Sequence, residues 1–83
     1  MKLNPGIYVR NEGERYVFFN PATRGLHFVS KGAHELVMMR LKMGFDEVVK
    51  PLSQGKTPDQ IKKFEGNLGE FYEGLIKRGV LVE

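Results

Sequence analysis

The sequence feature that most constrains the fold is a long amphipathic helix predicted between Thr57 and Gly79. Thr57 and Gln60 have the spacing of a capping box, and Pro58 suits the first helical position. The apolar residues follow a three-four spacing that forms one stripe along the helix: Ile61, Phe64, Leu68, Phe71 and Leu75. At about 1.5 Å per residue the helix is roughly 30 Å long, the width of a small domain. The rest of the chain must therefore cover this stripe.

Length and composition predict one small globular domain. Of the 83 residues, 41% are hydrophobic and 28% are charged, which is typical of a folded domain. The chain has no cysteine, which excludes disulfides and thiolate metal sites. It also has no apolar run of the roughly 20 residues that cross a bilayer, and no signal-peptide pattern at its N-terminus. We therefore expect a single domain over residues 1–83, located in the cytoplasm and not bound to a membrane.

The N-terminal third of the chain predicts a three-stranded antiparallel meander. Residues 6–10, 15–19 and 26–29 are rich in aromatic and β-branched side chains, and loops that contain Asn, Gly or Pro separate them. A sheet this small is not stable alone, so we expect a helix to pack against one of its faces.

From Ser30 the apolar spacing becomes helical. One helix is predicted from there to Gly44, and a shorter helix from Phe45 to about Ser53, where Pro51 should kink or end it. Residues 80–82 are predicted to form a short terminal strand. This order of elements predicts an α+β, winged-helix-like fold, in which a three-stranded antiparallel β-meander is followed by three helices.

The first of these helices has an unusual apolar arc. Met38, Met39 and Met43 widen it; we interpret them as core residues, and an adaptable binding surface is the alternative. Arg40 falls inside the same arc, so we expect its side chain to snorkel to solvent or to meet an acidic partner.

The residue types that perform catalysis or hold a metal are not arranged for those tasks. His27 and His34 are not in a ligand spacing, and the chain has neither a nucleophile elbow nor a phosphate-binding glycine loop. Its close acidic pairs lie in a turn and at a helix start, where carboxylates are ordinarily solvated or complement the helix dipole. We expect no enzymatic activity, no metal site and no cofactor.

The third predicted strand is the first candidate for binding. Its residues are Leu26, His27, Phe28 and Val29, and none is a lysine or a proline, the types that normally blunt an edge strand. At the edge of a meander such a strand presents unpaired backbone groups to another strand. We interpret it as a binding edge. The alternative is that residues 80–82 cover it.

One flank of the long helix, beside the apolar stripe, is the second candidate. Wound at about 100° per residue, Glu65, Gly69, Tyr72 and Ile76 line this flank. Tyr72 and Ile76 make it partly apolar, and Gly69 allows the close approach of another backbone, although glycine costs about 1 kcal/mol relative to Ala in a helix. We expect Tyr72 and Ile76 to stay partly exposed in the free protein. The alternative is ordinary tolerance of such residues on a long helix.

The order of elements and several residues resemble the PqqD-like family, small peptide-binding chaperones of pyrroloquinoline-quinone biosynthesis. These are related to the recognition elements of ribosomally made, modified peptides. Four segments in the same order and spacing carry the resemblance: residues 4–6 with Val9 and Arg10, residues 16–21 with Leu26, residues 44–49 with Leu52, and Phe71, Leu75, Gly79 and Val80. The chain departs from the family at Met43, where an acidic residue is usual, and at His27, where asparagine is common.

The resemblance implies a non-catalytic peptide-binding module. Such modules bind the leader of a precursor peptide as an added strand on the third strand, in the groove against the last helix. They present the peptide to a modifying enzyme, often a radical S-adenosylmethionine (SAM) enzyme. Strand addition gives affinity through main-chain hydrogen bonds. Leaders of this class tend to be acidic, which the net charge of +3 suits.

Two other functions fit the sequence less closely. A winged-helix nucleic-acid binder would place the long helix in the major groove, but the basic residues of that helix are balanced by acidic ones. We therefore expect no nucleic-acid partner. A dimerisation or scaffold domain is the other alternative, because an open strand edge can pair with its own copy. The sequence is compatible with a monomer or a homodimer.

Overall fold

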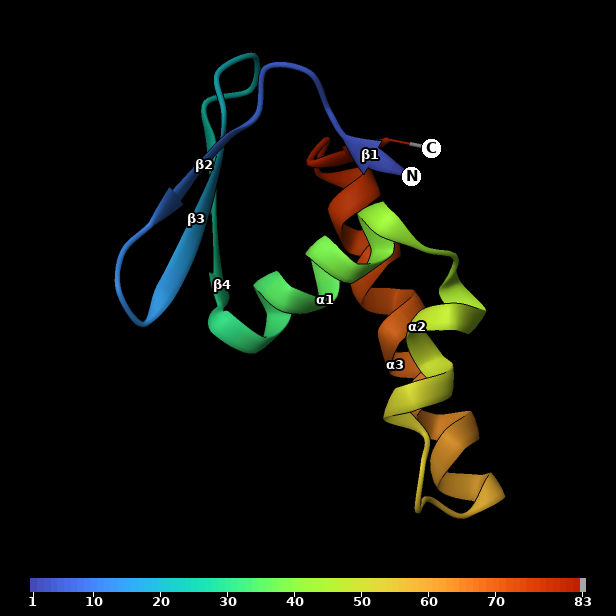
Figure 1. Ribbon diagram of the computed structural model, residues 1–83. Helices are drawn as coiled ribbons and strands as arrows, with labels where there is room; N and C mark the ends of the chain where they lie inside the picture. Colours follow the sequence, from blue (N-terminus) through green and yellow to red (C-terminus); the bar gives the residue numbers. More distant parts are fainter. Residues whose placement is uncertain (83) are drawn as a thin grey trace.

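The computed structural model describes residues 1–82 and confirms the predicted α+β fold, with a three-stranded antiparallel meander followed by three helices (Figure 1). A short strand near each end of the chain forms a second, two-stranded sheet. The elements in chain order are β1 (Lys2–Leu3), β2 (Tyr8–Asn11), β3 (Arg15–Asn20), β4 (Gly25–Ser30), α1 (Lys31–Lys42), α2 (Phe45–Leu52), α3 (Pro58–Lys77) and β5 (Leu81–Val82).

The meander has the strand order β2-β3-β4, and β4 is the strand nearest the helices (Figure 1). One face turns toward the helices and includes Phe18, which is fully buried, and Val29, which is half-buried. The Tyr16 ring lies on the same face and stacks on His34 of α1, with 3.6 Å between ring centroids. This contact joins the sheet to α1, as the small size of the sheet predicted.

No loop separates the sheet from the helices. Ser30 is both the last residue of β4 and the N-cap of α1, where its hydroxyl oxygen accepts a hydrogen bond from the Ala33 N–H at 3.1 Å. Because strand and helix share this residue, the direction in which α1 leaves the sheet is set by a single cap.

The predicted ends of the long helix are confirmed. The Thr57 hydroxyl and the Gln60 side chain form both bonds of the capping box. At the other end Val80 donates to the Leu75 carbonyl and Gly79 to the Ile76 carbonyl, which is the Schellman pattern. Gly79 has φ +76°, a left-handed conformation that favours glycine.

The face of α3 that enters the core differs from the predicted stripe. Leu68, Tyr72 and Leu75 are buried, whereas Phe71 is only half-buried. Tyr72 is 3% exposed, its hydroxyl donates to the Leu36 carbonyl of α1 at 2.6 Å, and its ring meets the edge of Phe45. The expectation that Tyr72 stays partly open is therefore wrong, because its phenol has a buried polar partner on α1 and its ring fills the space between the helices.

Arg40 of α1 lies beside this buried tyrosine. Within residues 1–82 its guanidinium donates to the Met43 carbonyl at 3.0 Å, so its partner is a free carbonyl at the end of α1 instead of a carboxylate. Burial raises the pKa of the Tyr72 phenol above its usual value, and the positive charge of Arg40 offsets part of that rise.

The terminal strand does not cover the meander. β5 pairs with β1, with Leu81 opposite Leu3, and Asn4 extends this pairing through bonds to Val80 and Gly79. The predicted terminal strand is therefore present, but the alternative in which it covers the third strand of the meander is wrong. β4 is left as an edge strand of its sheet.

We predict that Tyr72→Phe lowers the free energy of unfolding by about 0.5–1.5 kcal/mol at neutral pH, because it removes one buried hydrogen bond and leaves the ring in place. Urea denaturation measures this. A variant as stable as the wild type would show that the bond to Leu36 adds nothing to stability.

The stabilising effect of the Tyr72 hydroxyl should disappear in alkali. Above about pH 10 the unfolded chain loses its phenolic proton, while the folded chain retains it because the pKa of Tyr72 is raised. The contribution is complete below about pH 10 and is lost as the pH rises through the folded pKa. The difference in unfolding free energy between wild type and Tyr72→Phe should therefore shrink between about pH 8 and about pH 11. A constant difference would contradict the assignment.

Candidate functional site

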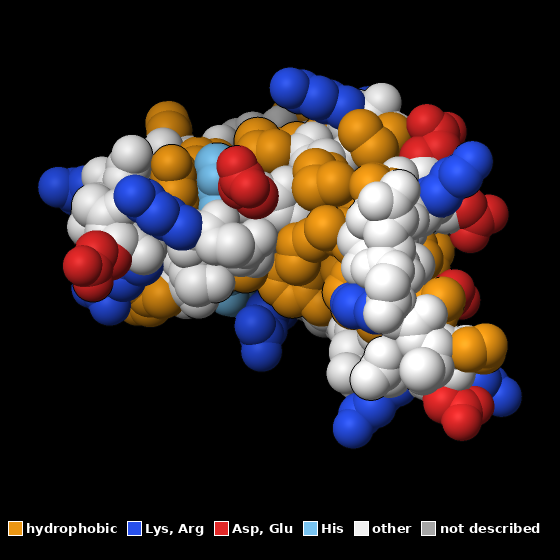
Figure 2. Space-filling view, turned by 60° about the horizontal axis from the view of Figure 1, so that its bottom comes forward, with side chains coloured by type: hydrophobic (Ala, Val, Ile, Leu, Met, Phe, Trp, Pro, Cys, Tyr) orange, Lys and Arg blue, Asp and Glu red, His pale blue; other side chains and the backbone are white. Residues whose placement is uncertain are grey.

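A groove runs between β4 and α3 and has a volume of about 390 Å³. Figure 2 shows apolar side chains gathered on the face between the sheet, at the left, and the helices, at the right. The groove is lined by His27, Phe28, Val29 and Ser30 of β4, Ala33 of α1, and Glu70, Phe71, Gly74, Leu75 and Arg78 at the end of α3. Of the four predicted strand residues, His27, Phe28 and Val29 line the groove and Leu26 does not.

The turn between β2 and β3 determines which neighbouring strand each backbone group of β3 bonds to. Opposite residues of an antiparallel pair alternate between hydrogen-bonded and non-hydrogen-bonded pairs. The Glu12 N–H donates to the Arg15 carbonyl at 2.8 Å, so this pair is hydrogen-bonded. Counting along the register, Val17 and Phe19 also direct their backbone groups toward β2. The alternate residues of β3 bond to β4: Tyr16, Phe18 and Asn20.

The same alternation identifies the free groups of β4. Gly25, His27 and Val29 lie opposite the residues that bond to β4, so their N–H and C=O groups are used inside the sheet. Leu26, Phe28 and Ser30 alternate with these residues and turn to the other side, which is the free edge. Ser30 is already engaged as the N-cap of α1, so Leu26 and Phe28 each present one free N–H and one free C=O group there. These four groups form a template for an added strand, and Phe28 places it beside the groove.

On α3 the groove is lined by one flank of the helix. Phe71 supplies an apolar wall, and an added Cβ at Gly74 would meet no atom within 4 Å, so glycine leaves this part of the groove open. β4 and α3 run in opposite directions (Figure 1), so Arg78 lies toward the Leu26 end of the groove and Glu70 toward its other end. The groove is therefore apolar in the middle, with one charge of each sign along its helical side.

The predicted flank of α3 is not the one that faces β4. Glu65, Gly69 and Ile76 do not line the groove, and Tyr72 between them is buried. Ile76 is half-buried and packs against the core. The apolar arc of the helix runs from Phe71 at one border to Tyr72 and Ile76 at the other, and the spacing cannot show which border turns to the sheet. The residue that could have identified the flank facing β4 was Phe71, but the three-four spacing assigned it to the core.

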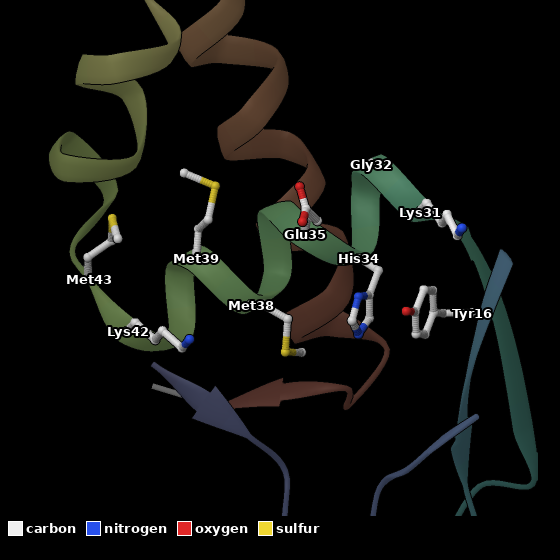
Figure 3. Close-up of a pocket in the computed structure, with 9 residues that line it drawn as sticks. All are labelled: Tyr16, Lys31, Gly32, His34, Glu35, Met38, Met39, Lys42 and Met43. Atoms are coloured by element: carbon white, nitrogen blue, oxygen red, sulfur yellow. The ribbon is translucent and has the colours of Figure 1, made fainter. Parts of the chain in front are cut away.

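A second and larger hollow, of about 730 Å³, lies along α1. Figure 3 shows the facing rings of Tyr16 and His34, and shows Met38 and Met39 leaving α1 on opposite sides. No residue of β4 lines this hollow, so it offers no backbone edge to a peptide. Met38, Met39 and Met43 are half-buried, pack against the core and also line the hollow. The groove at β4 is therefore the stronger candidate despite its smaller volume.

No family model, curated protein or solved structure matches the chain. Among residues 1–82, no helix combines the length and the apolar composition that crossing a membrane requires. The same residues contain no group of three or more His, Asp or Glu side chains placed to hold a metal ion. The function must therefore be argued from the groove itself.

We predict that Gly74→Ala and Gly69→Ala each raise the free energy of unfolding by about 0.5–1 kcal/mol. Both glycines lie inside α3, where Ala is favoured over Gly by this amount. An added Cβ at either position has no neighbour within 4 Å. Urea denaturation checks both variants. Destabilisation by Gly74→Ala alone would show that the groove is closed in solution.

Proposed function

We propose that the chain is a non-catalytic peptide-binding module. It captures the leader segment of a ribosomal precursor peptide as an added strand on β4 and presents it to a peptide-modifying enzyme, such as a radical SAM enzyme. The observation that supports this most is the uncovered edge of β4, with four free backbone groups beside an apolar groove. The proposal needs neither a cofactor nor a metal in this chain, and it places the protein in the cytoplasm.

The chemistry of the edge suits an extended peptide. Each of Leu26 and Phe28 offers one main-chain donor and one main-chain acceptor. Because these groups bond to the peptide backbone, peptides of many different sequences can bind. Selectivity then comes from alternate side chains, which enter the groove near Phe71 and Leu75. The guanidinium of Arg78 at one end favours an acidic side chain there, in keeping with a net charge of +3.

The resemblance to PqqD-like modules supports the same proposal from an independent direction. In that family the leader binds along the third strand of the meander and against the last helix, which correspond to β4 and α3 here. The resemblance supplies the classes of partner, a precursor peptide and its modifying enzyme. The geometry adds that the peptide would contact the Phe71 flank of α3 and not the flank of Tyr72.

The main test replaces a free backbone donor of β4. Peptides are first selected from a displayed random library against the wild-type chain, and their affinities are measured by calorimetry. We predict that Phe28→Pro weakens them about ten-fold or more relative to Phe28→Ala, because only proline removes the edge N–H. Both variants lose the aromatic side chain, so the comparison isolates the backbone bond.

Circular dichroism must show that Phe28→Pro is folded, which we expect because proline is tolerated where an edge N–H faces outward. Val29→Pro is unsuitable, because that N–H belongs to the pairing with Tyr16. Equal affinities for Phe28→Pro and Phe28→Ala would place the peptide elsewhere. Tight binding of duplex DNA that weakens steeply with added salt would instead support the nucleic-acid alternative.

A second test fills the groove. Gly74→Leu places a side chain in the open space beside Phe71 and should weaken the selected peptides about ten-fold. Gly69→Leu is the matched control, because it lies on the same helix, has equally open surroundings and does not line the groove. Its affinity should equal that of the wild type. Loss of affinity in Gly69→Leu alone would return the site to the flank of Tyr72 and Ile76.

A further inference from the structure

The outer face of the meander, turned away from the helices, exposes three large apolar side chains among charged ones. Tyr8 is 66% exposed, Leu26 is 56% exposed and Phe28 is 53% exposed. Antiparallel sheets with one solvated face are normally polar on that face. Scattered apolar residues on a surface need no explanation, but these three belong to one arrangement across the sheet.

The register places the exposed residues in two rows that cross all three strands. Tyr8, Phe19 and Leu26 lie directly opposite one another, and the Tyr8 and Phe19 rings are stacked with centroids 6.4 Å apart. The next row consists of Arg10, Val17 and Phe28, of which Val17 is buried and Phe28 is exposed, and the guanidinium of Arg15 lies 4.3 Å from the centre of the Phe28 ring. Both rows end at β4, where the sheet stops.

The last members of the two rows are also the residues with free backbone groups. Leu26 and Phe28 direct their N–H and C=O groups to the open edge of β4. In a strand added there, the residues opposite Leu26 and Phe28 are two positions apart, and their side chains fall on the outer face. The residue between them lies opposite His27 and turns to the groove.

We infer that the bound peptide is read on both faces of the extended sheet, and that it has apolar side chains at two positions separated by one residue. These two side chains continue the rows that end at Leu26 and Phe28, while the intervening side chain enters the groove. This inference rests on the proposed function, and it names the class of peptide that the site takes. Apolar and aromatic cross-strand neighbours stabilise a sheet in this way.

The space beside the edge favours a single strand over a second copy of this chain. The groove of about 390 Å³ accommodates a few side chains of an extended segment. A second copy pairing through its own β4 would bring α1 with it, because Ser30 joins the two directly. It would also bring its own α3 groove wall to the same edge. A peptide strand has no such bulk.

The test reads the sequences of the peptides that a displayed random library yields against the wild-type chain. The relevant peptides are those that bind Phe28→Pro more weakly than Phe28→Ala, because these need the edge N–H. In them we expect apolar residues at two positions separated by one residue. Leu26→Ser should weaken these peptides about three- to ten-fold. Tyr8→Ser, which removes an even more exposed apolar residue from the far end of the same row, should leave their affinity unchanged.

The outcomes separate this inference from the proposed function. One result would be peptides that require the edge N–H but have polar residues at both outer positions and bind Leu26→Ser as tightly as the wild type. That result would overturn the inference about the outer face and leave the proposed function intact. Peptides that bind without the edge N–H would overturn the proposed function and this inference with it. A concentration-dependent dimer in sedimentation that Leu26→Ser dissociates, and that no selected peptide displaces, would assign the rows to a second copy.

Discussion

The buried contact between Tyr72 and Leu36 fixes how α3 is rotated about its own axis. The phenol is removed from water and donates to a backbone carbonyl of α1, so turning the helix would expose the ring and leave a buried polar group without its partner. With Tyr72 held toward α1, Phe71 and Gly74 turn toward β4. The identity of the residues in the groove therefore depends on a hydrogen bond outside the groove.

The other wall of the groove is positioned by the junction between sheet and helices. Ser30 ends β4 and caps α1, and the stacking of Tyr16 on His34 holds the sheet against that helix. The N-terminal strand pairs with β5 and leaves β4 uncovered. The groove thus lies between two walls, each fixed to α1 by its own contacts, and its apolar middle can remain open without a loss of core packing.

The two faces of the meander have different physical tasks. The inner face buries Phe18 against the helices and contributes to the core. The outer face exposes large apolar side chains, which in the free chain contact only their neighbours in the sheet. Hydrophobic burial favours covering such a surface, and the uncovered edge of β4 is where the rows would continue.

The sequence by itself determined the elements of this protein. The capping box at Thr57, the stop at Gly79 and the alternation of strand residues are local signals, because each depends on neighbours a few residues away. The sequence also predicted an edge strand without lysine or proline at residues 26–29, and this strand is β4, which borders the groove. Only the tertiary structure decided which flank of α3 faces that edge and which backbone groups of β4 are free. The physical reason is that a wide apolar arc can be buried at either of its borders. The bond from Tyr72 to Leu36, two residues separated by a whole helix, selects the border that is buried.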